Sequence, residues 1–468
     1  MSHLIGYNLG ALHQASHELN RHIDSTYYPS ALTIDENPVI PSPSTFDNLN
    51  DLHQDNLPTM SQCAVHLELL EVFHALRIKV MDSKALDETF KLGEPVNKVY
   101  RRKYVPGWEK RGVNHLVTLR NLRWELNQDK KWTYYLGEAA QRFVKWASSF
   151  DTSLASERAR EGSGSDDGLG GILITDAASL PPVDILMVWH AFLLNPADFL
   201  EYCRTFSLNY LPRTGLLTAL QHQSIWSQGT IRDTWEYNSE AREDKSGESA
   251  YTGNLLHSII RKGNILTLDI NKTFRPAIIG KFVENVERQR VFVEKMNVHL
   301  WIRSPALQGT LQRAVDRYEN YLELFKLYPG KMLVPTLDID LVWHTSQLSP
   351  AAYKNSMDAR CGRFINHDDK IGKSKLAIGN DETQSLYYTR FGLEYSVCLC
   401  WECQAIMSAV EDSEKDGSLE KSNSSDVAQD LTDKVLEDIN YYRAVESARR
   451  KNHIKLPIRN RVVSVPGV

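Results

Sequence analysis

The sequence lacks the features that mark membrane or secreted proteins. No apolar run approaches the roughly 20 residues that a membrane-spanning helix needs. Residues 1–20 have no basic start and no unbroken apolar stretch, so we predict no secretion signal. Six cysteines in 468 residues are too few for a disulfide scaffold. We therefore expect reduced thiols and a location in the cytoplasm or nucleus.

Familiar catalytic motifs are also missing. The sequence contains no P-loop, no dinucleotide-binding glycine pattern after a strand, no nucleophile elbow, no HExxH and no EF-hand loop. Alternation of apolar and polar residues is scarce, and ILTLDI at 265–270 is the single short strand we predict. The formal net charge of −5 gives no general attraction to nucleic acid or anionic lipid. Motifs alone therefore specify no reaction.

A segment that occurs twice is the most informative feature present. Residues 181–199 read PPVDILMVWHAFLLNPADF, and residues 335–353 read PTLDIDLVWHTSQLSPAAY. Tryptophan and histidine are rare, so this agreement indicates two related structural units. We predict a mainly α fold in which two related helical units, produced by internal duplication, carry long polar loops. The positions we assign to the shared structural motif are Asp184, Trp189, His190, Asp338, Trp343 and His344.

Helical periodicity and polar stretches suggest how the rest of the chain is organised. Apolar residues three or four apart from Val65 to Val80 predict a helix, and the charged segment 238–249 is the best linker. We predict a flexible arm at 1–55, a first helical unit with its Trp-His corner at 56–237, a second helical unit with its corner and a cysteine cluster at 251–408, and a charged linker, a helix and a basic tail at 409–468. The tail is the one part expected to touch nucleic acid, and only weakly. A protein partner is also compatible with these polar segments, and a membrane is not expected.

Each repeated segment predicts two helices that meet at a tight corner. Asn195-Pro196 and Ser349-Pro350 pair a preferred N-cap residue with the residue preferred at the first helical position. A new helix should therefore start at each proline. The tryptophan of each corner should be a buried packing centre.

The corner histidines have two interpretations. In the first, they are satisfied core residues, and the motif aspartates bond backbone N–H groups near the helix start. In the second, His190 and His344 converge on one pocket as ligands or acid–base groups. The second copy differs from the first because Asp340 stands four residues before His344, where side chains meet on one helix face, and the first copy has Leu186 there.

The second unit adds further candidate site residues. If there is a catalytic site, we expect it around Asp340, His344, His367 and Asp368, because the second corner adds Asp340 beside His344 and the polar His367 and Asp368 follow this corner. A zinc site is a separate hypothesis: three thiols spaced C-x-C-x2-C and one imidazole could supply four ligands, namely Cys398, Cys400, Cys403 and His367. The alternative is that these cysteines pack as small apolar residues in a core helix.

Several stretches resemble the conserved N-terminal domain of the plant and fungal glycine-rich domain-containing protein family. They are CAVHLELLEVFHAL (63–76), PPVDILMVWHAFLLNP (181–196), VPTLDIDLVWHTSQLSP (334–350), GRFINHDDK (362–370) and YSVCLCWEC (395–403), within roughly residues 56–408. In that family a second histidine usually follows the corner histidine by two residues. Here those positions hold Phe192 and Ser346, and we expect a member without the glycine-rich tail, since glycines do not cluster near residue 468. The resemblance implies no established enzyme activity, although plant relatives are associated with stress and growth responses.

Two functions follow as hypotheses. The first is a non-enzymatic helical scaffold or regulator, which the missing second histidines and absent catalytic motifs favour. The second is an uncharacterised, metal-assisted enzyme, for example in fungal specialised metabolism, with Asp340, His344 and His367 in its site.

Overall fold

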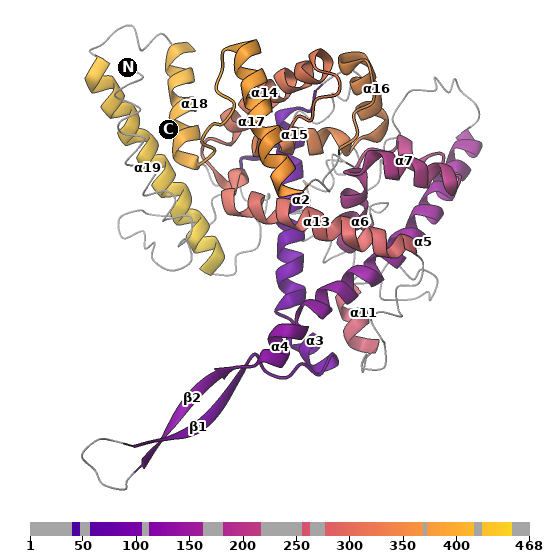
Figure 1. The fold of residues 1–468 in the computed structure, drawn as a ribbon, viewed down its shortest axis with the longest axis vertical. Helices are drawn as coiled ribbons and strands as arrows, with labels where there is room; N and C mark the ends of the chain where they lie inside the picture. The colour runs from indigo at the N-terminus through magenta and orange to yellow at the C-terminus, as the bar shows by residue number, and fades with distance from the viewer. Residues whose placement is uncertain are drawn as a thin grey trace.

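The computed structural model describes residues 40–46, 57–104, 112–161, 181–216, 255–262, 277–367, 372–415 and 424–451. The predicted linker at 238–249, the predicted strand at 265–270, most of the predicted arm at 1–55 and the tail beyond residue 451 lie outside these ranges. The prediction of a mainly α fold is confirmed, because helices dominate the described chain (Figure 1). The helices are α2 (Met60–Met81), α3 (Lys84–Thr89), α4 (Leu122–Asn127), α5 (Asp129–Glu161), α6 (Val183–Leu193), α7 (Pro196–Thr205), α11 (Leu255–Lys262), α13 (Ala277–His299), α14 (Leu307–Leu327), α15 (Leu337–Gln347), α16 (Pro350–Cys361), α17 (Lys373–Phe391), α18 (Trp401–Lys415) and α19 (Ser424–Lys451), with 3-10 turns η1 (Pro43–Phe46), η3 (Leu211–Arg213) and η5 (Trp301–Arg303).

Helix α2 lies at the centre of the helical body. It starts at a capping box, in which Thr59 Oγ1 accepts from the Gln62 N–H at 3.2 Å and Gln62 Oε1 accepts from the Thr59 N–H at 3.0 Å. The apolar stripe that predicted this helix is buried from Val65 to Val80. Helix α2 contacts α5 and α13 as well as α14 and α15, so it joins the regions that carry the two corners (Figure 1).

The two corners have the same local form. Helices α6 and α15 each contain 11 residues, and the helices that follow start at Pro196 and Pro350, as predicted. The prediction that Asn195 and Ser349 cap these helices through side-chain hydrogen bonds is wrong, however. Asn195 donates from Nδ2 to the Ala191 carbonyl at 3.0 Å, and neither Asn195 nor Ser349 caps the new helix through its side chain. Local likeness of the corners leaves duplication of the whole units a prediction.

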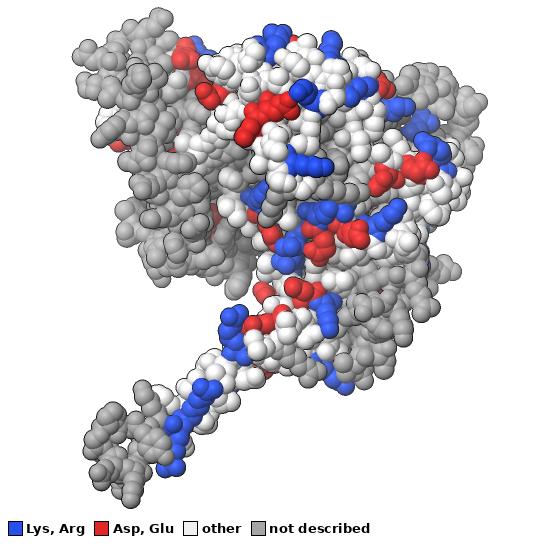
Figure 2. Space-filling view, viewed as in Figure 1, with Lys and Arg blue, Asp and Glu red and all other residues white. Residues whose placement is uncertain are grey.

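A β-hairpin that the sequence did not predict projects from the helical body (Figure 1). Strands β1 (Val96–Tyr104) and β2 (Gly112–Arg120) pair antiparallel, with Val99 opposite Val117. The described side chains on both faces of the hairpin are exposed or half-buried. Because neither face is buried, the strands lack the usual alternation of apolar and polar residues. Lysine and arginine side chains line the ribbon, whereas both charge signs are mixed on the visible face of the body (Figure 2).

The buried apolar residues form one connected core. It extends from Phe46 to Ile439 and includes side chains of both corners, so the predicted first and second units share it. Within the described residues, no single helix is long and apolar enough to span a membrane; α6 and α7 reach that length only together, and they meet at a bend of 109°. The shared core brings residues that are far apart in sequence into the site described next.

Candidate metal centre at the second corner

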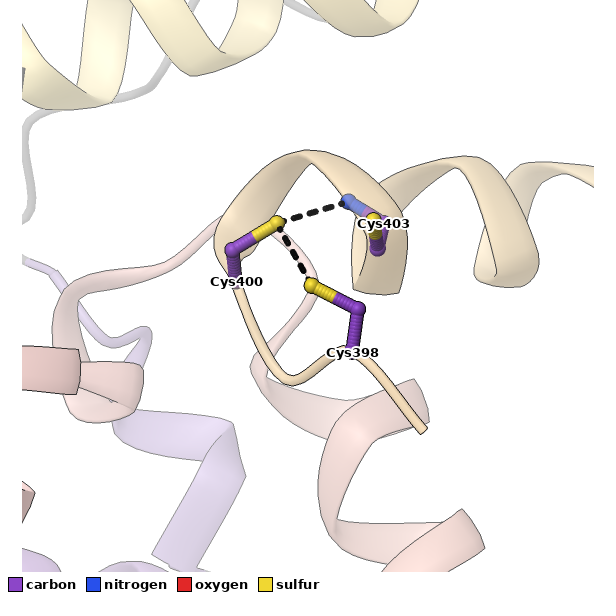
Figure 3. A group of neighbouring side chains, drawn as sticks. All are labelled: Cys398, Cys400 and Cys403. Atoms are coloured by element: carbon purple, nitrogen blue, oxygen red, sulfur yellow. Dashed lines mark hydrogen bonds between the residues drawn. The ribbon is translucent and has the colours of Figure 1, made fainter. Parts of the chain in front are cut away.

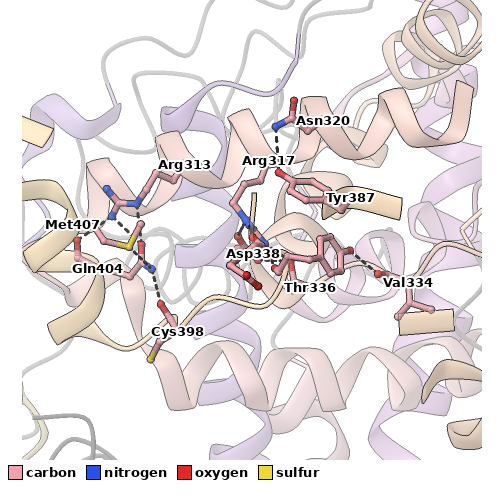
Figure 4. Close-up of polar contacts among 12 residues, drawn as sticks. Arg313, Arg317, Asn320, Val334, Thr336, Asp338, Tyr387, Cys398, Gln404 and Met407 are labelled. Atoms are coloured by element: carbon pink, nitrogen blue, oxygen red, sulfur yellow. Dashed lines mark hydrogen bonds and ion pairs between the residues drawn. The ribbon is translucent and has the colours of Figure 1, made fainter. Parts of the chain in front are cut away.

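Each corner helix is fixed by an ion pair to the helix that packs behind it. On α15, Asp338 Oδ2 accepts from Arg317 Nε at 2.6 Å, and Asp338 Oδ1 accepts from the Thr336 hydroxyl at 2.6 Å (Figure 4). On α6, Asp184 lies 3.4 Å from Arg142 Nε of α5 and is fully buried. Burial raises the Asp184 pKa, while Arg142 and nearby backbone N–H groups lower it, leaving it above its usual value. The two motif aspartates therefore have structural partners.

The corner tryptophans pack as predicted. Trp189 is fully buried and lies 5.0 Å from the ring of Trp146. Trp343 is buried too, and its Nε1 donates to the Tyr353 hydroxyl at 3.0 Å, which joins α15 to α16. That hydroxyl in turn donates to the Ile365 carbonyl at 2.6 Å. This chain of hydrogen bonds holds the segment that leads to His367.

Three of the candidate site residues meet beside the second corner. His344 Nε2 lies 3.1 Å from His367 Nε2. Asp340 Oδ1 lies 3.3 Å from His344 Nε2 and 3.6 Å from His367 Nε2. Asp340 and His344 come from one face of α15, and His367 comes from the segment after α16. The fourth candidate, Asp368, lies outside the described residues.

The spacing of these three donor atoms fits a metal site. The two contacts of Asp340 Oδ1 are longer than ordinary hydrogen bonds, which cluster near 2.9 Å. A triangle with these three sides has a point about 1.9 Å from every corner, and a shift of about 0.7 Å out of the plane makes each distance about 2.05 Å. Zinc binds imidazole nitrogen and carboxylate oxygen at about 2.0–2.2 Å.

Aromatic rings hold both imidazoles in place. Phe292 of α13 lies 4.4 Å from His344 between ring centroids, and Trp343 meets His367 edge-on at 4.9 Å. The His344 side chain is 2% exposed, whereas Asp340 is 22% exposed, so the centre opens towards solvent on the carboxylate side. Burial raises the Asp340 pKa, but His344, His367 and Lys295 outweigh it, and the pKa lies below its usual value. The carboxylate is thus ready to bind a cation.

The first corner histidine belongs to a different arrangement. Thr345 donates its hydroxyl to the Leu341 carbonyl at 2.7 Å, so its oxygen accepts from His66 Nδ1 at 2.9 Å. A neutral imidazole carries one proton, which assigns His66 Nε2 as the acceptor of the His190 Nε2–H at 2.8 Å. This chain of hydrogen bonds links α15, α2 and α6. Sequence reasoning missed it because His66 precedes His190 by 124 residues.

His66 and His190, the two histidines of this hydrogen-bonded series, are both neutral at physiological pH. Burial lowers the His190 pKa to about 3, with a smaller effect from His344. Burial also lowers the His66 pKa well below its usual value, and His190 and His344 add to the effect. The first corner has no carboxylate beside its histidine, because Leu186 stands where the second corner has Asp340. It therefore fits the prediction of satisfied core histidines, and His190 and His344 pair with different partners.

The predicted zinc set divides into two groups. His367 joins Asp340 and His344, while the sulfurs of Cys398, Cys400 and Cys403 form a second group whose atoms lie within 4.8 Å of one another (Figure 3). The prediction that His367 completes the cysteine site is therefore wrong. The expectation of a core helix carrying these cysteines is also wrong in part, because α18 starts at Trp401 and leaves the first two cysteines in the preceding loop.

Comparison with known proteins agrees with the resemblance seen in the sequence. Residues 219–356 match the family model described as glycine-rich domain-containing protein-like. The chain is 27% identical to glycine-rich domain-containing protein 1 of Arabidopsis thaliana over 236 residues, which covers 47% of this chain and 26% of the relative. It is 26% identical to glycine-rich domain-containing protein 2 of the same plant over 230 residues, which covers 46% of this chain and 26% of that relative.

The match spans about a quarter of the length of these curated relatives. No solved structure matches the chain. The family match includes Asp340 and His344. It begins after α2 and α6, which leaves out His66 and His190, and it ends before His367. Over these residues, the chain is similar to the glycine-rich domain-containing protein-like family.

Proposed function

We propose that this protein binds a divalent transition-metal ion through Asp340, His344 and His367 and uses it in a metal-assisted reaction. The observation that carries the proposal is the triangle of donor atoms, whose sides of 3.1, 3.3 and 3.6 Å suit one ion at ordinary bond lengths. Two imidazoles and one carboxylate are the ligand set of catalytic zinc in some hydrolases and of non-haem iron in oxygenases. We also propose a location in the cytoplasm or nucleus, a reducing environment that would keep the cysteines as free thiols.

The exposure of Asp340 supports a reactive rather than a purely structural ion. Three protein ligands leave at least one coordination position for water or substrate, whereas structural zinc sites are closed by four. The partly exposed carboxylate faces that open side. Lys295 of α13 is exposed and close enough to lower the Asp340 pKa, so a negatively charged substrate would be favoured there.

Metal content of the purified protein tests the proposal. Wild type loaded with zinc should retain one equivalent that Asp340→Asn and His344→Ala lose. The zinc affinity of each variant should fall by more than the roughly 10- to 100-fold that follows loss of a hydrogen-bond partner outside the ligand set. His190→Gln is the matched control, because His190 is the corresponding histidine of the first corner and lies outside the triangle. Equal metal retention in all four proteins would contradict the proposal.

The projecting hairpin favours a second candidate, a scaffold that binds a protein partner. Tyr100 and Leu116 lie opposite one another on the two strands and are 73% and 51% exposed. Large apolar side chains on an exposed ribbon are common at protein interfaces. A wild-type protein that takes up neither zinc nor iron at the triangle, and that loses partner binding when Tyr100 and Leu116 become serine, would support this function instead.

A further inference from the structure

Three cysteines gather where the loop before α18 enters the helix. Cys398 Sγ lies 3.4 Å from Cys400 Sγ, too far for a disulfide bond of about 2.05 Å. The Cys403 N–H donates to Cys400 Sγ at 3.5 Å (Figure 3). All three sulfurs lie within 4.8 Å of one another, and Cys400 is buried while the other two are half-buried. Within the described residues, no histidine or carboxylate joins them as a fourth member at that spacing.

The loop that carries the first two cysteines is held by neighbouring side chains. Gln404 Nε2 donates to the Cys398 carbonyl at 2.7 Å, and Arg313 of α14 holds the Gln404 side-chain oxygen at 2.8 Å (Figure 4). Trp301 Nε1 donates to the Leu399 carbonyl at 2.8 Å. These bonds fix the loop backbone at Cys398 and Leu399, so the fold helps to position the sulfurs.

The arrangement of the sulfurs suits a metal ion. Thiolates bound to zinc at about 2.3 Å lie about 3.8 Å apart in a tetrahedral site, which is longer than the 3.4 Å between Cys398 Sγ and Cys400 Sγ and shorter than the 4.8 Å that bounds all three sulfurs. Three thiolates this close together repel one another, so a cation is needed before all three sulfurs can ionise together.

We propose that Cys398, Cys400 and Cys403 bind one thiophilic metal ion, zinc or cuprous copper, through three sulfurs. Each thiol gives up its proton as its sulfur binds, so uptake releases protons to solvent. Zinc would take a solvent molecule as its fourth ligand, whereas cuprous ion is satisfied by soft thiolates alone. The ion ties the loop to the first turn of α18. Because α18 also binds α14 through Arg313 and α19 through the buried Glu402–Arg443 ion pair, it holds this side of the fold together.

This site is independent of the centre at the second corner, and metal counting separates the two. With both sites loaded, wild type should hold two equivalents of zinc, and the triple variant C398S/C400S/C403S should hold one. His344→Ala should also hold one, but through the cysteines. The control is Cys203→Ala, which removes a buried cysteine of α7 outside the cluster and should keep both ions.

Spectroscopy and alkylation identify the ligand atoms and the ion. Cobalt in place of zinc should give an intense thiolate-to-metal charge-transfer band in wild type and in His344→Ala, and none in the triple variant. Under reducing conditions, cuprous ion added instead should protect the same three cysteines from alkylation if copper is the preferred occupant. If the triple variant does not fold, mapping of alkylated cysteines in wild type with and without chelator decides the matter. Chelator-independent alkylation, or a Cys398–Cys400 disulfide in protein purified under reducing conditions, would overturn the proposal.

Discussion

Acidification from pH 7 to pH 5 should destabilise the fold, and His190 should account for a defined part of the loss. The pKa of His190 is about 3 in the folded protein, against 6.5 for an unperturbed histidine. Between these two values the unfolded chain binds a proton that the folded chain refuses, so stability rises with pH in this window and falls as pH drops below 6.5. Integrating the proton-binding difference for one such group from pH 7 to pH 5 gives a loss of about 2 kcal/mol.

The size of this loss is set mainly by the unfolded chain, because pH 5 lies well above the folded pKa. His190→Gln removes the titrating group and keeps a donor for His66 Nε2. Urea unfolding followed by far-UV circular dichroism at pH 7 and pH 5 should therefore show about 2 kcal/mol less acid destabilisation in the variant than in wild type. His115→Gln on the exposed hairpin is the control and should behave like wild type. Equal pH dependence in His190→Gln and wild type would refute the reasoning.

Three further predictions concern stability and are checked by the same unfolding measurements. Gly379→Ala should destabilise the fold by about 1–3 kcal/mol, because a Cβ there would stand 2.6 Å from Met332 Cε and 2.8 Å from a Val334 methyl. Gly280→Ala is the matched control: it has open space around it and should stabilise the fold by about 0.5–1 kcal/mol. Ser349→Ala should cost less than the usual ~1 kcal/mol of a lost N-cap, since this serine makes no cap hydrogen bond. Arg317→Met should cost about 3–5 kcal/mol, because it leaves Asp338 buried without its cation; a smaller loss would mean that water or Thr336 compensates the carboxylate.

The helices and corners could be predicted because their signals are local. The apolar stripe from Val65 to Val80 and the prolines at 196 and 350 act over a few residues, and each helix formed where its pattern indicated. The hairpin could not be predicted in the same way, because it does not pack on the hydrophobic core. Neither strand therefore has an apolar face that would give an alternating pattern.

The second-corner centre could be predicted in part, for a similar reason. Asp340 and His344 share one turn of helix, and His367 follows only 23 residues later. The partnership of His66 with His190 depends on how α2 packs between distant helices, which a single sequence does not reveal. The choice of His367 as a cysteine partner was wrong because sequence proximity to the cysteines gave no information on which way its imidazole would turn.

The central position of α2 has a consequence for how this chain can be divided into pieces. A fragment cut at the limits of the family match, residues 219–356, would carry α13, α14 and α15 but would lose the helix that contacts all three. Thr345 would lose its imidazole partner, and α13, α14 and α15 would lose the part of the shared core that α2 supplies. Such a fragment is a unit of sequence comparison and not a unit of folding, so expression boundaries should enclose α2 as well.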